Sequence, residues 1–107
     1  MKLIGLAALT TLLFSCTSSE KVNELAQCLN EKGATVYGAS GCGYCSNLKE
    51  DLGESVSLIK YVDCGAEPAK CAEEKIESLP TIILSDGTRI TGYRSLERLA
   101  EKTGCEW

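Results

Sequence analysis

Two cysteines separated by two residues, Cys42 and Cys45, stand between a β-like run at 35–39 and a helix-like run at 46–52. A C-x-x-C pair at a strand-to-helix junction is typical of a redox-active dithiol. Cys42 is expected at the helix N-terminus, where unpaired backbone N–H groups and the positive end of the helix dipole favour its thiolate. Cys45 follows one turn later, more enclosed and able to attack a mixed disulfide on Cys42. We therefore expect Cys42 to be the attacking thiol and Cys45 the resolving thiol.

Two other roles compete for this pair. A zinc site needs a second pair of ligands, but the sequence has no His and no second C-x-x-C, so we expect no metal. A permanently closed structural disulfide is the other role, and the spacing alone leaves it open. The sequence also contains no motif for a soluble cofactor, and we expect none.

The N-terminus has the pattern of an export signal, because Lys2 precedes a short apolar run from Leu3 to Phe14. The run is too short for a stable membrane span. The residues Leu13-Phe14-Ser15-Cys16 resemble the bacterial lipobox, in which the cysteine thiol receives a diacylglycerol and becomes the mature N-terminus. The resemblance implies a lipid anchor on Cys16. Secretion without lipid and a buried apolar N-terminal helix are the alternatives.

The net charge and the number of cysteines restrict the kinds of partner and the cellular compartment that we expect. The formal net charge is −4 and no basic patch is present, so we expect no nucleic-acid partner. Setting Cys16 aside leaves an even number of the seven cysteines, which suits an oxidising compartment. Together with the export signal, this predicts an exported, membrane-anchored lipoprotein that faces the periplasm or the cell exterior.

Hydrophobic periodicity and turn residues predict the order helix, β, α, β, α, β, β, α. The expected elements are a helix at 20–32 with Ser19 as N-cap, a strand at 34–39, a helix at 46–52, a strand at 56–62, a short helix from Pro68, strands at 82–84 and 89–92, and a last helix between Ser95 and Gly104. Strand, helix and strand in succession predict parallel pairing with a right-handed crossover. The Asp86-Gly87 pair predicts an antiparallel hairpin.

The C-x-x-C after the first strand, the proline before the third strand and the terminal hairpin with its helix resemble the thioredoxin fold over residues 34–104. More narrowly, five stretches resemble the thioredoxin-like domain associated with vitamin K epoxide reductase homologues: 28–33, 37–39, 61–64, 79–81 and 95–100. In those bacterial relatives the domain is often fused to a four-helix membrane reductase and exchanges electrons with it. The resemblance implies an α/β fold with a four-stranded mixed sheet, flanking helices and an extra N-terminal helix.

The export signal, the lipobox and this resemblance together divide the chain, and the resemblance implies roles for single residues. Residues 1–15 would be the signal peptide, 16–33 the tether and N-terminal helix, and 34–107 the thioredoxin-like domain. Pro80 resembles the family's cis-proline facing the dithiol, with the backbone of Leu79 left free to pair with a substrate strand. Gly92 resembles the glycine that borders the substrate groove. A trans turn proline and a simple strand-end glycine are the alternatives for these positions.

Three positions depart from the family pattern. Gly41 replaces a tryptophan before the first cysteine and leaves Cys42 more open, while Tyr44 replaces a histidine before the second cysteine. We expect both residues to contact substrate. Val36 stands where thioredoxins have a buried acid, so no carboxylate is evident for the proton of Cys45. The Gly43-Tyr44 dipeptide matches a periplasmic disulfide isomerase, and the sequence leaves oxidase, reductase and isomerase directions open.

Four further cysteines allow three pairings, of which we expect Cys64 with Cys71 and Cys28 with Cys105. The first closes a short loop and the second ties the leading helix to the C-terminus. Chain entropy assigns them about 2.5 and about 4.5 kcal/mol of stabilisation. The alternative for Cys64 and Cys71 is a second redox pair that relays electrons to the dithiol.

These observations predict a membrane-tethered thiol–disulfide oxidoreductase outside the cytoplasm. Its partners would be substrate proteins with thiols or disulfides, and the resemblance implies a membrane reductase similar to vitamin K epoxide reductase as redox partner. Two alternatives are a non-catalytic binding module that uses the thioredoxin-like groove, and a glutathione-dependent reductase of the glutaredoxin type.

Overall fold

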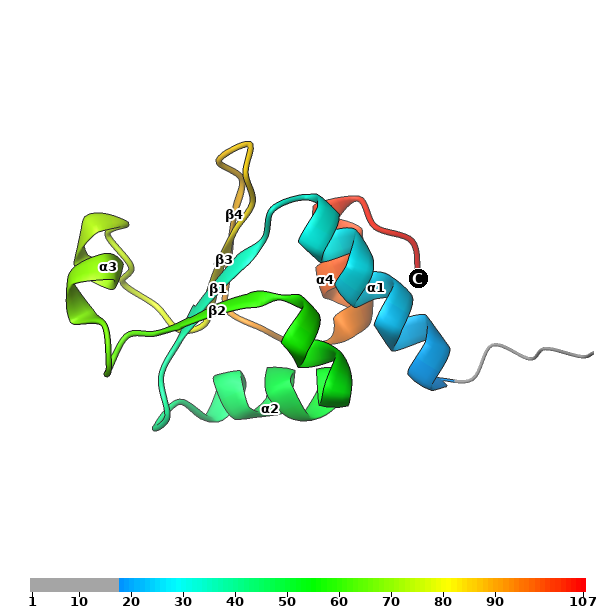
Figure 1. Ribbon diagram of the computed structural model, residues 1–107, viewed down its shortest axis with the longest axis horizontal. Helices are drawn as coiled ribbons and strands as arrows, with labels where there is room; N and C mark the ends of the chain where they lie inside the picture. The colour runs from blue at the N-terminus through cyan, green and yellow to red at the C-terminus, as the bar shows by residue number, and fades with distance from the viewer. Residues whose placement is uncertain (1–17) are drawn as a thin grey trace, which may run out of the picture.

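The computed structural model describes residues 18–107, which form a sheet with helices on both sides (Figure 1). The predicted signal peptide at 1–15 and the predicted lipid site Cys16 lie outside the described residues. The elements are α1 (Ser18–Glu31), β1 (Thr35–Gly38), α2 (Gly43–Leu52), the 3₁₀ helix η1 (Gly53–Leu58), β2 (Lys60–Asp63), α3 (Pro68–Glu73), β3 (Thr81–Ile83), β4 (Arg89–Thr91) and α4 (Leu96–Thr103).

The four strands form a mixed sheet in the order β2-β1-β3-β4. The β1 and β2 strands pair in parallel, and α2 lies in the crossover that connects them, as the strand-helix-strand pattern predicts. The β3 strand pairs antiparallel with both β1 and β4. At the hairpin between β3 and β4, Oδ1 of Asp86 accepts a hydrogen bond from the backbone N–H of Thr88 over 2.9 Å. The predicted four-stranded mixed sheet with flanking helices and an extra N-terminal helix is confirmed.

The helices are unevenly distributed over the sheet. Figure 1 shows α1, α2 and α4 gathered on one side and α3 on the other. The β1 strand alternates accordingly, because Val36 is buried whereas its neighbour Tyr37 is partly exposed. Side chains from α1, α2, the sheet and α4 form the core: Leu25, Leu29, Val36, Leu48, Leu52, Ile82, Ile90, Leu96 and Leu99.

Several predicted boundaries were wrong, among them the N-cap of the first helix and the start of the second strand. The first helix already includes Ser18, so Ser19 lies inside its first turn and is not its N-cap. Residues 56–58 were expected to begin the second strand, but they belong to η1. The reason lies in another element: the side chain of Asn30 on α1 donates a hydrogen bond to the carbonyl of Leu58 over 2.6 Å. The Asn30 side chain therefore takes the place of the neighbouring strand as hydrogen-bond partner of the Leu58 carbonyl.

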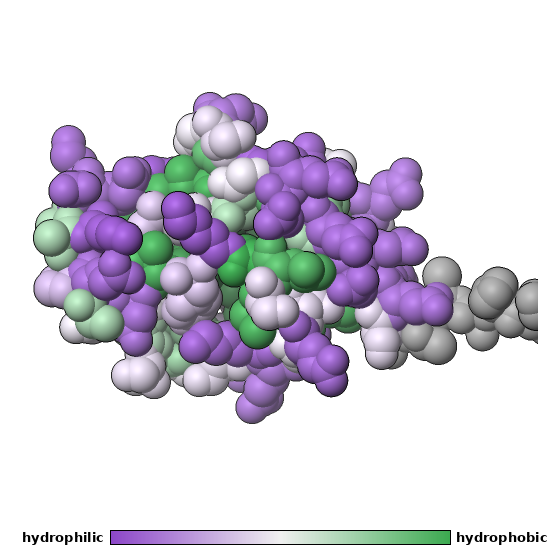
Figure 2. Space-filling view, viewed as in Figure 1, coloured by the Kyte–Doolittle hydropathy of each residue, from purple (hydrophilic) through white to green (hydrophobic). Residues whose placement is uncertain are grey.

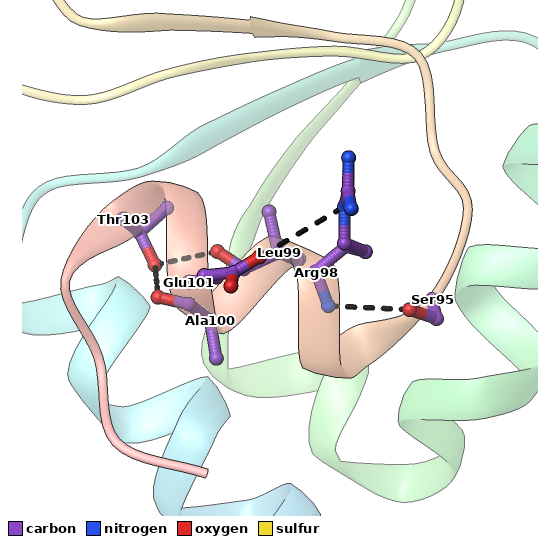
Figure 3. Close-up of polar contacts among 6 residues, drawn as sticks. All are labelled: Ser95, Arg98, Leu99, Ala100, Glu101 and Thr103. Atoms are coloured by element: carbon purple, nitrogen blue, oxygen red, sulfur yellow. Dashed lines mark hydrogen bonds and ion pairs between the residues drawn. The ribbon is translucent and has the colours of Figure 1, made fainter.

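The C-terminal helix α4 is closed at both ends by polar contacts (Figure 3). Oγ of Ser95 accepts a hydrogen bond from the backbone N–H of Arg98 over 3.2 Å, as the N-cap prediction requires. Near the other end, the hydroxyl of Thr103 donates to the carbonyl of Leu99 over 2.8 Å, and Gly104 adopts φ +78°. The left-handed backbone favours glycine and turns the chain toward Cys105.

The surface of the domain is mostly polar on the face drawn in Figure 2. Hydrophilic residues fill the periphery, and hydrophobic residues gather near the middle of the same face. Among residues 18–107, none of the helices is both long and apolar enough to cross a membrane.

Candidate active site

Cys42 occupies the N-cap position of α2 with extended backbone angles of φ −94° and ψ 116°. Its Sγ accepts a hydrogen bond from the backbone N–H of Cys45 over 3.1 Å, the contact that a Ser or Asp side chain makes at other helix N-termini. The two cysteines form a disulfide with their Cα atoms 5.2 Å apart. The predicted attacking thiol thus lies at the positive end of a ten-residue helix.

The two sulfurs of the dithiol differ in access. Cys45 is 1% exposed and packs into the domain, whereas Cys42 is partly exposed. The space beside Cys42 is open, because a Cβ added at Gly41 or at Gly43 would meet no atom within 4 Å. A substrate sulfur can therefore approach Cys42 from solvent, while Cys45 is buried behind it.

The Leu79–Pro80 peptide bond is cis, which is the conformation that the resemblance implies. Pro80 is buried and Leu79 is partly exposed. The carbonyl of Pro80 accepts a hydrogen bond from the backbone N–H of Gly92 over 2.7 Å. Gly92 adopts φ +84°, a conformation that few residues other than glycine take, so the glycine is required by the backbone at this point.

A groove of about 600 Å³ opens beside the dithiol helix. It is lined by Tyr44 and Asn47 from α2, by residues 90–95 around the end of β4, and by Arg98, Leu99 and Lys102 from α4. Two predicted substrate-contacting residues, Tyr44 and Gly92, therefore line one groove. Tyr44 is 63% exposed, so its ring is available to a partner. The other three predicted residues, Gly41, Leu79 and Pro80, are not among the groove-lining residues.

The charges of the groove are uniform in sign. Three cationic side chains, Arg94, Arg98 and Lys102, line it, and none of its lining residues is acidic. Arg98 also lies 3.9 Å from the carboxylate of Glu101 on the same helix (Figure 3). The whole chain has a formal net charge of −4, so the positive charge of this groove is opposite in sign to that of the chain.

Tyr93, at the edge of the groove, connects it to the dithiol helix. Its hydroxyl donates a hydrogen bond of 2.5 Å to Oδ2 of Asp51 at the end of α2. Burial, and then this hydrogen bond, raise the pKa of Tyr93 well above its ordinary value. The contact fixes the chain after β4 against α2, and hence one wall of the groove against the helix that carries the cysteines.

Tyr61 and Gly38 lie behind Cys45, and the sequence analysis missed both as site residues. A Cβ on Gly38 would overlap the hydroxyl of Tyr61 and lie 3.1 Å from Sγ of Cys45. The Nζ atom of Lys49 lies 4.3 Å from the centre of the Tyr61 ring. The available signal was the glycine itself, because a glycine inside a strand often marks a close approach of another group.

The other cysteines form the pairings expected from the sequence. Cys28 on α1 is joined to Cys105 after α4, and Cys64 after β2 is joined to Cys71 on α3. The backbone N–H of Cys64 donates to the carbonyl of Gly38 over 2.7 Å, so this second pair begins at the same sheet edge as the dithiol loop. Within the described part of the chain, no group of three or more Cys, Asp or Glu side chains could hold a metal ion.

Known proteins similar to this chain include a curated relative and a solved structure. No family model matches the chain. A curated relative, the thiol-disulfide oxidoreductase LTO1 of Arabidopsis thaliana, is 37% identical over 99 residues, covering 84% of this chain and 26% of the relative. The chain thus spans about a quarter of the length of this relative.

A solved structure, the NTD_N/C domain of the alkylhydroperoxide reductase AhpF from Enterococcus faecalis, superposes with a TM-score of 0.54 at 16% identity. The match covers 76% of this chain and 42% of that one. The fold is thioredoxin-like. The thioredoxin-like architecture places the C-x-x-C at the start of α2 and the cis-proline before β3, the two features that the sequence resemblance had singled out.

Proposed function

We propose that the protein is a thiol–disulfide oxidoreductase whose redox pair is Cys42 and Cys45. The observation that carries the proposal is the contrast between the two sulfurs: Cys42 is partly exposed and bonded to a helix N-terminal N–H, and Cys45 is buried behind it. The 37% identity to a protein named a thiol-disulfide oxidoreductase supports the same chemistry.

The mechanism follows from this contrast. In the reductive direction the Cys42 thiolate attacks one sulfur of a substrate disulfide, and the other substrate sulfur leaves as a thiolate. The Cys45 thiolate then attacks Sγ of Cys42, which forms the Cys42–Cys45 disulfide and releases the second substrate thiolate. Oxidation of a dithiol substrate runs the same steps backwards. The direction depends on the reduction potentials of the pair and its partners.

The substrate proteins would bind beside the dithiol through backbone and groove contacts. The partly exposed Leu79, next to the cis-proline, offers its backbone to an extended substrate segment, as sheet edges do in other peptide complexes. Flanking parts of the segment would enter the groove between Tyr44 and Gly92. Gly41 leaves the approach to Cys42 open.

We also propose that the protein acts outside the cytoplasm, tethered to the membrane by a lipid on Cys16. The support is the sequence 13–16, the apolar run before it and the even number of remaining cysteines. The resemblance to domains associated with vitamin K epoxide reductase homologues favours a membrane reductase of that kind as redox partner. Labelled fatty acid incorporation into the wild-type chain, absent from a Cys16→Ala chain, tests the anchor.

The oxidoreductase function is tested by trapping the mixed disulfide. A Cys45→Ser chain is expected to accumulate a covalent complex with a disulfide-containing substrate protein, because the resolving thiol is missing. A Cys42→Ser chain is the matched control and is expected to form no such complex. If neither variant traps substrate and the wild-type chain catalyses no exchange, the domain is instead a non-catalytic binding module.

A further inference from the structure

The hydroxyl of Tyr61 is buried without a hydrogen-bond partner among residues 18–107, and no other side-chain oxygen or nitrogen in this part of the chain shares that condition. Buried polar groups are nearly always paired, because an unpaired one loses its bonds to water and gains none. This hydroxyl lies next to a redox pair, so a neighbouring sulfur that becomes a better acceptor after reduction could pair with it.

The position of Tyr61 identifies that partner. Tyr61 on β2 is the register neighbour of Val36 on β1, so its side chain extends from the same face of the sheet as the buried Val36. Gly38 follows two residues later on that face. Because Gly38 has no Cβ, the Tyr61 hydroxyl and Sγ of Cys45 share the space that a Cβ would fill.

From this geometry we infer that Tyr61 is a positioning residue for the resolving thiol: after reduction of the dithiol, its O–H donates a hydrogen bond to the Cys45 thiolate. The inference rests on the proposed function, because it concerns the step in which Cys45 acts. In the disulfide the Cys45 sulfur is neutral and a weak acceptor, and the Tyr61 hydroxyl has no hydrogen-bond partner among the described residues. When the reduced Cys45 loses its proton for the attack, the sulfur carries a charge and is a strong acceptor.

The surroundings make the hydroxyl a donor and not a base. Burial, and then the nearby Asp63 carboxylate, raise the pKa of Tyr61 above its ordinary value, so the proton stays on the oxygen at neutral pH. The charged groups that face Tyr61 are Asp63 on its own strand and Lys49 from α2, whose Nζ lies over the ring. Neither reaches the hydroxyl with a hydrogen bond.

The role in turnover is confined to one step. The Cys45 thiolate attacks Sγ of Cys42 in the mixed disulfide, so that the Cys45–Cys42 bond forms while the Cys42–substrate bond breaks. The electron pair of that bond leaves with the substrate sulfur, which takes a proton from water. Tyr61 keeps its own proton throughout and holds the thiolate in place by the hydrogen bond until the attack. This chain has Val36 where thioredoxins have a buried acid, and the Tyr61 hydrogen bond acts on the thiolate itself and does not replace that proton acceptor.

The test compares Tyr61→Phe with Tyr37→Phe, which removes a tyrosine hydroxyl from the opposite face of the same sheet. Both are made in the full chain with Cys16→Ser and Cys42→Ser, so that Cys45 is the one remaining thiol outside the two other disulfides. The titration of Cys45 is followed by the carbon chemical shift of its Cβ. The expected result is a pKa of Cys45 higher by about one unit in Tyr61→Phe, a tenfold smaller thiolate fraction, and no change in Tyr37→Phe. Equal pKa values in the two variants would overturn the inference.

A second measurement uses the intact dithiol. A tenfold smaller thiolate fraction, partly offset by the greater nucleophilicity of a more basic thiolate, predicts release of the substrate thiol about threefold slower in Tyr61→Phe. The oxidised Tyr61→Phe chain should be at least as resistant to urea as the wild type, because it loses only an unpaired hydroxyl. A lower urea midpoint would contradict the inference by showing that the hydroxyl has a partner in the disulfide state.

The proposed function can fail separately. If the wild-type chain exchanges no disulfides, the oxidoreductase proposal fails, whereas the Cys45 titration still reports on Tyr61. If exchange is normal and the titration does not depend on Tyr61, only the present inference fails.

Discussion

The backbone N–H of Cys45 donates a hydrogen bond to Sγ of Cys42 over 3.1 Å, so the first turn of α2 binds the sulfur of the more exposed cysteine. The same N–H would stabilise a negative charge on that sulfur after reduction, in addition to the helix dipole. This hydrogen bond distinguishes the sulfur of Cys42 from that of Cys45, whereas the C-x-x-C spacing by itself does not.

Cys42 should therefore be a reactive thiol at mildly acidic pH. In the reduced chain we expect iodoacetamide to label Cys42 at least about tenfold faster near pH 6 than an ordinary thiol, because its pKa is lowered below about 8.5. Peptide mapping identifies the labelled residue, and glutathione serves as the reference thiol. Labelling of Cys42 at the rate of glutathione would contradict the assignment of the attacking thiol.

Gly38 should tolerate no side chain. A Cβ there would overlap the hydroxyl of Tyr61 and lie 3.1 Å from Sγ of Cys45, so Gly38→Ala forces a buried ring and a buried sulfur apart. We expect a loss of about 1 to 3 kcal/mol in the free energy of unfolding, measured by urea denaturation. The matched control is Gly41→Ala, where a Cβ meets nothing within 4 Å and the expected change is within about 0.5 kcal/mol. Equal effects of the two substitutions would show that the space behind Cys45 is not filled as described.

The two other disulfides should differ in their contribution to stability. Cys28 and Cys105 are 77 residues apart in sequence, and Cys64 and Cys71 are 7 apart. In the chain-entropy account, replacing the first pair by serines costs about 4.5 kcal/mol and replacing the second costs about 2.5 kcal/mol. Urea denaturation of the two double variants measures the difference. A larger loss for the Cys64/Cys71 pair would assign that pair a role in native packing beyond closing its loop.

Tyr93 should make stability depend on alkaline pH. Burial and the hydrogen bond to Asp51 raise the pKa of Tyr93 above 10.0, so the folded chain keeps a proton that the unfolded chain releases. Its contribution is therefore complete below that value and is lost as the pH rises through the raised pKa. Tyr93→Phe is expected to cost about 1.5 kcal/mol near pH 8 and to reduce the fall in stability between about pH 8 and pH 11.

The control for this prediction is Tyr44→Phe, whose hydroxyl belongs to an exposed side chain. It should leave the pH dependence of the urea midpoint unchanged. Some fall at alkaline pH should persist in Tyr93→Phe, because burial also raises the pKa values of Tyr37 and Tyr61. A pH dependence identical to that of the wild type would show that Tyr93 is not held by Asp51.

Much of the fold follows from local signals in the sequence. The C-x-x-C between a strand and a helix, Pro80 before β3 and the Asp86-Gly87 turn are short-range patterns with one dominant structural meaning each. Residues 56–58 escaped prediction because their conformation depends on Asn30, a residue from another element. Secondary-structure propensity, which is read along the sequence, gives no information about a contact between two elements.

The candidate site also has a part that the sequence predicts and a part that depends on tertiary contacts. Cys42 and Cys45 follow from their spacing, but the environment of Cys45 depends on the register that places Tyr61 beside Val36 and on the missing Cβ of Gly38. One wall of the groove likewise depends on the contact between Tyr93, after β4, and Asp51 on α2, two residues that are distant in sequence. Contacts of this kind arise only once the sheet and its helices have packed.

The most direct test of the redox role of Cys42 and Cys45 is their equilibrium reduction potential, measured by thiol trapping in defined redox buffers with intact mass and peptide mapping. A Cys16→Ser chain avoids a seventh thiol. We predict that Cys42 and Cys45 open as one pair between about −120 and −270 mV, while the other four cysteines stay oxidised. A value near the lower limit indicates a reductase and one near the upper limit an oxidant. If Cys42 and Cys45 instead stay closed below about −300 mV, as structural disulfides do, they are not a redox pair and the proposed function is wrong.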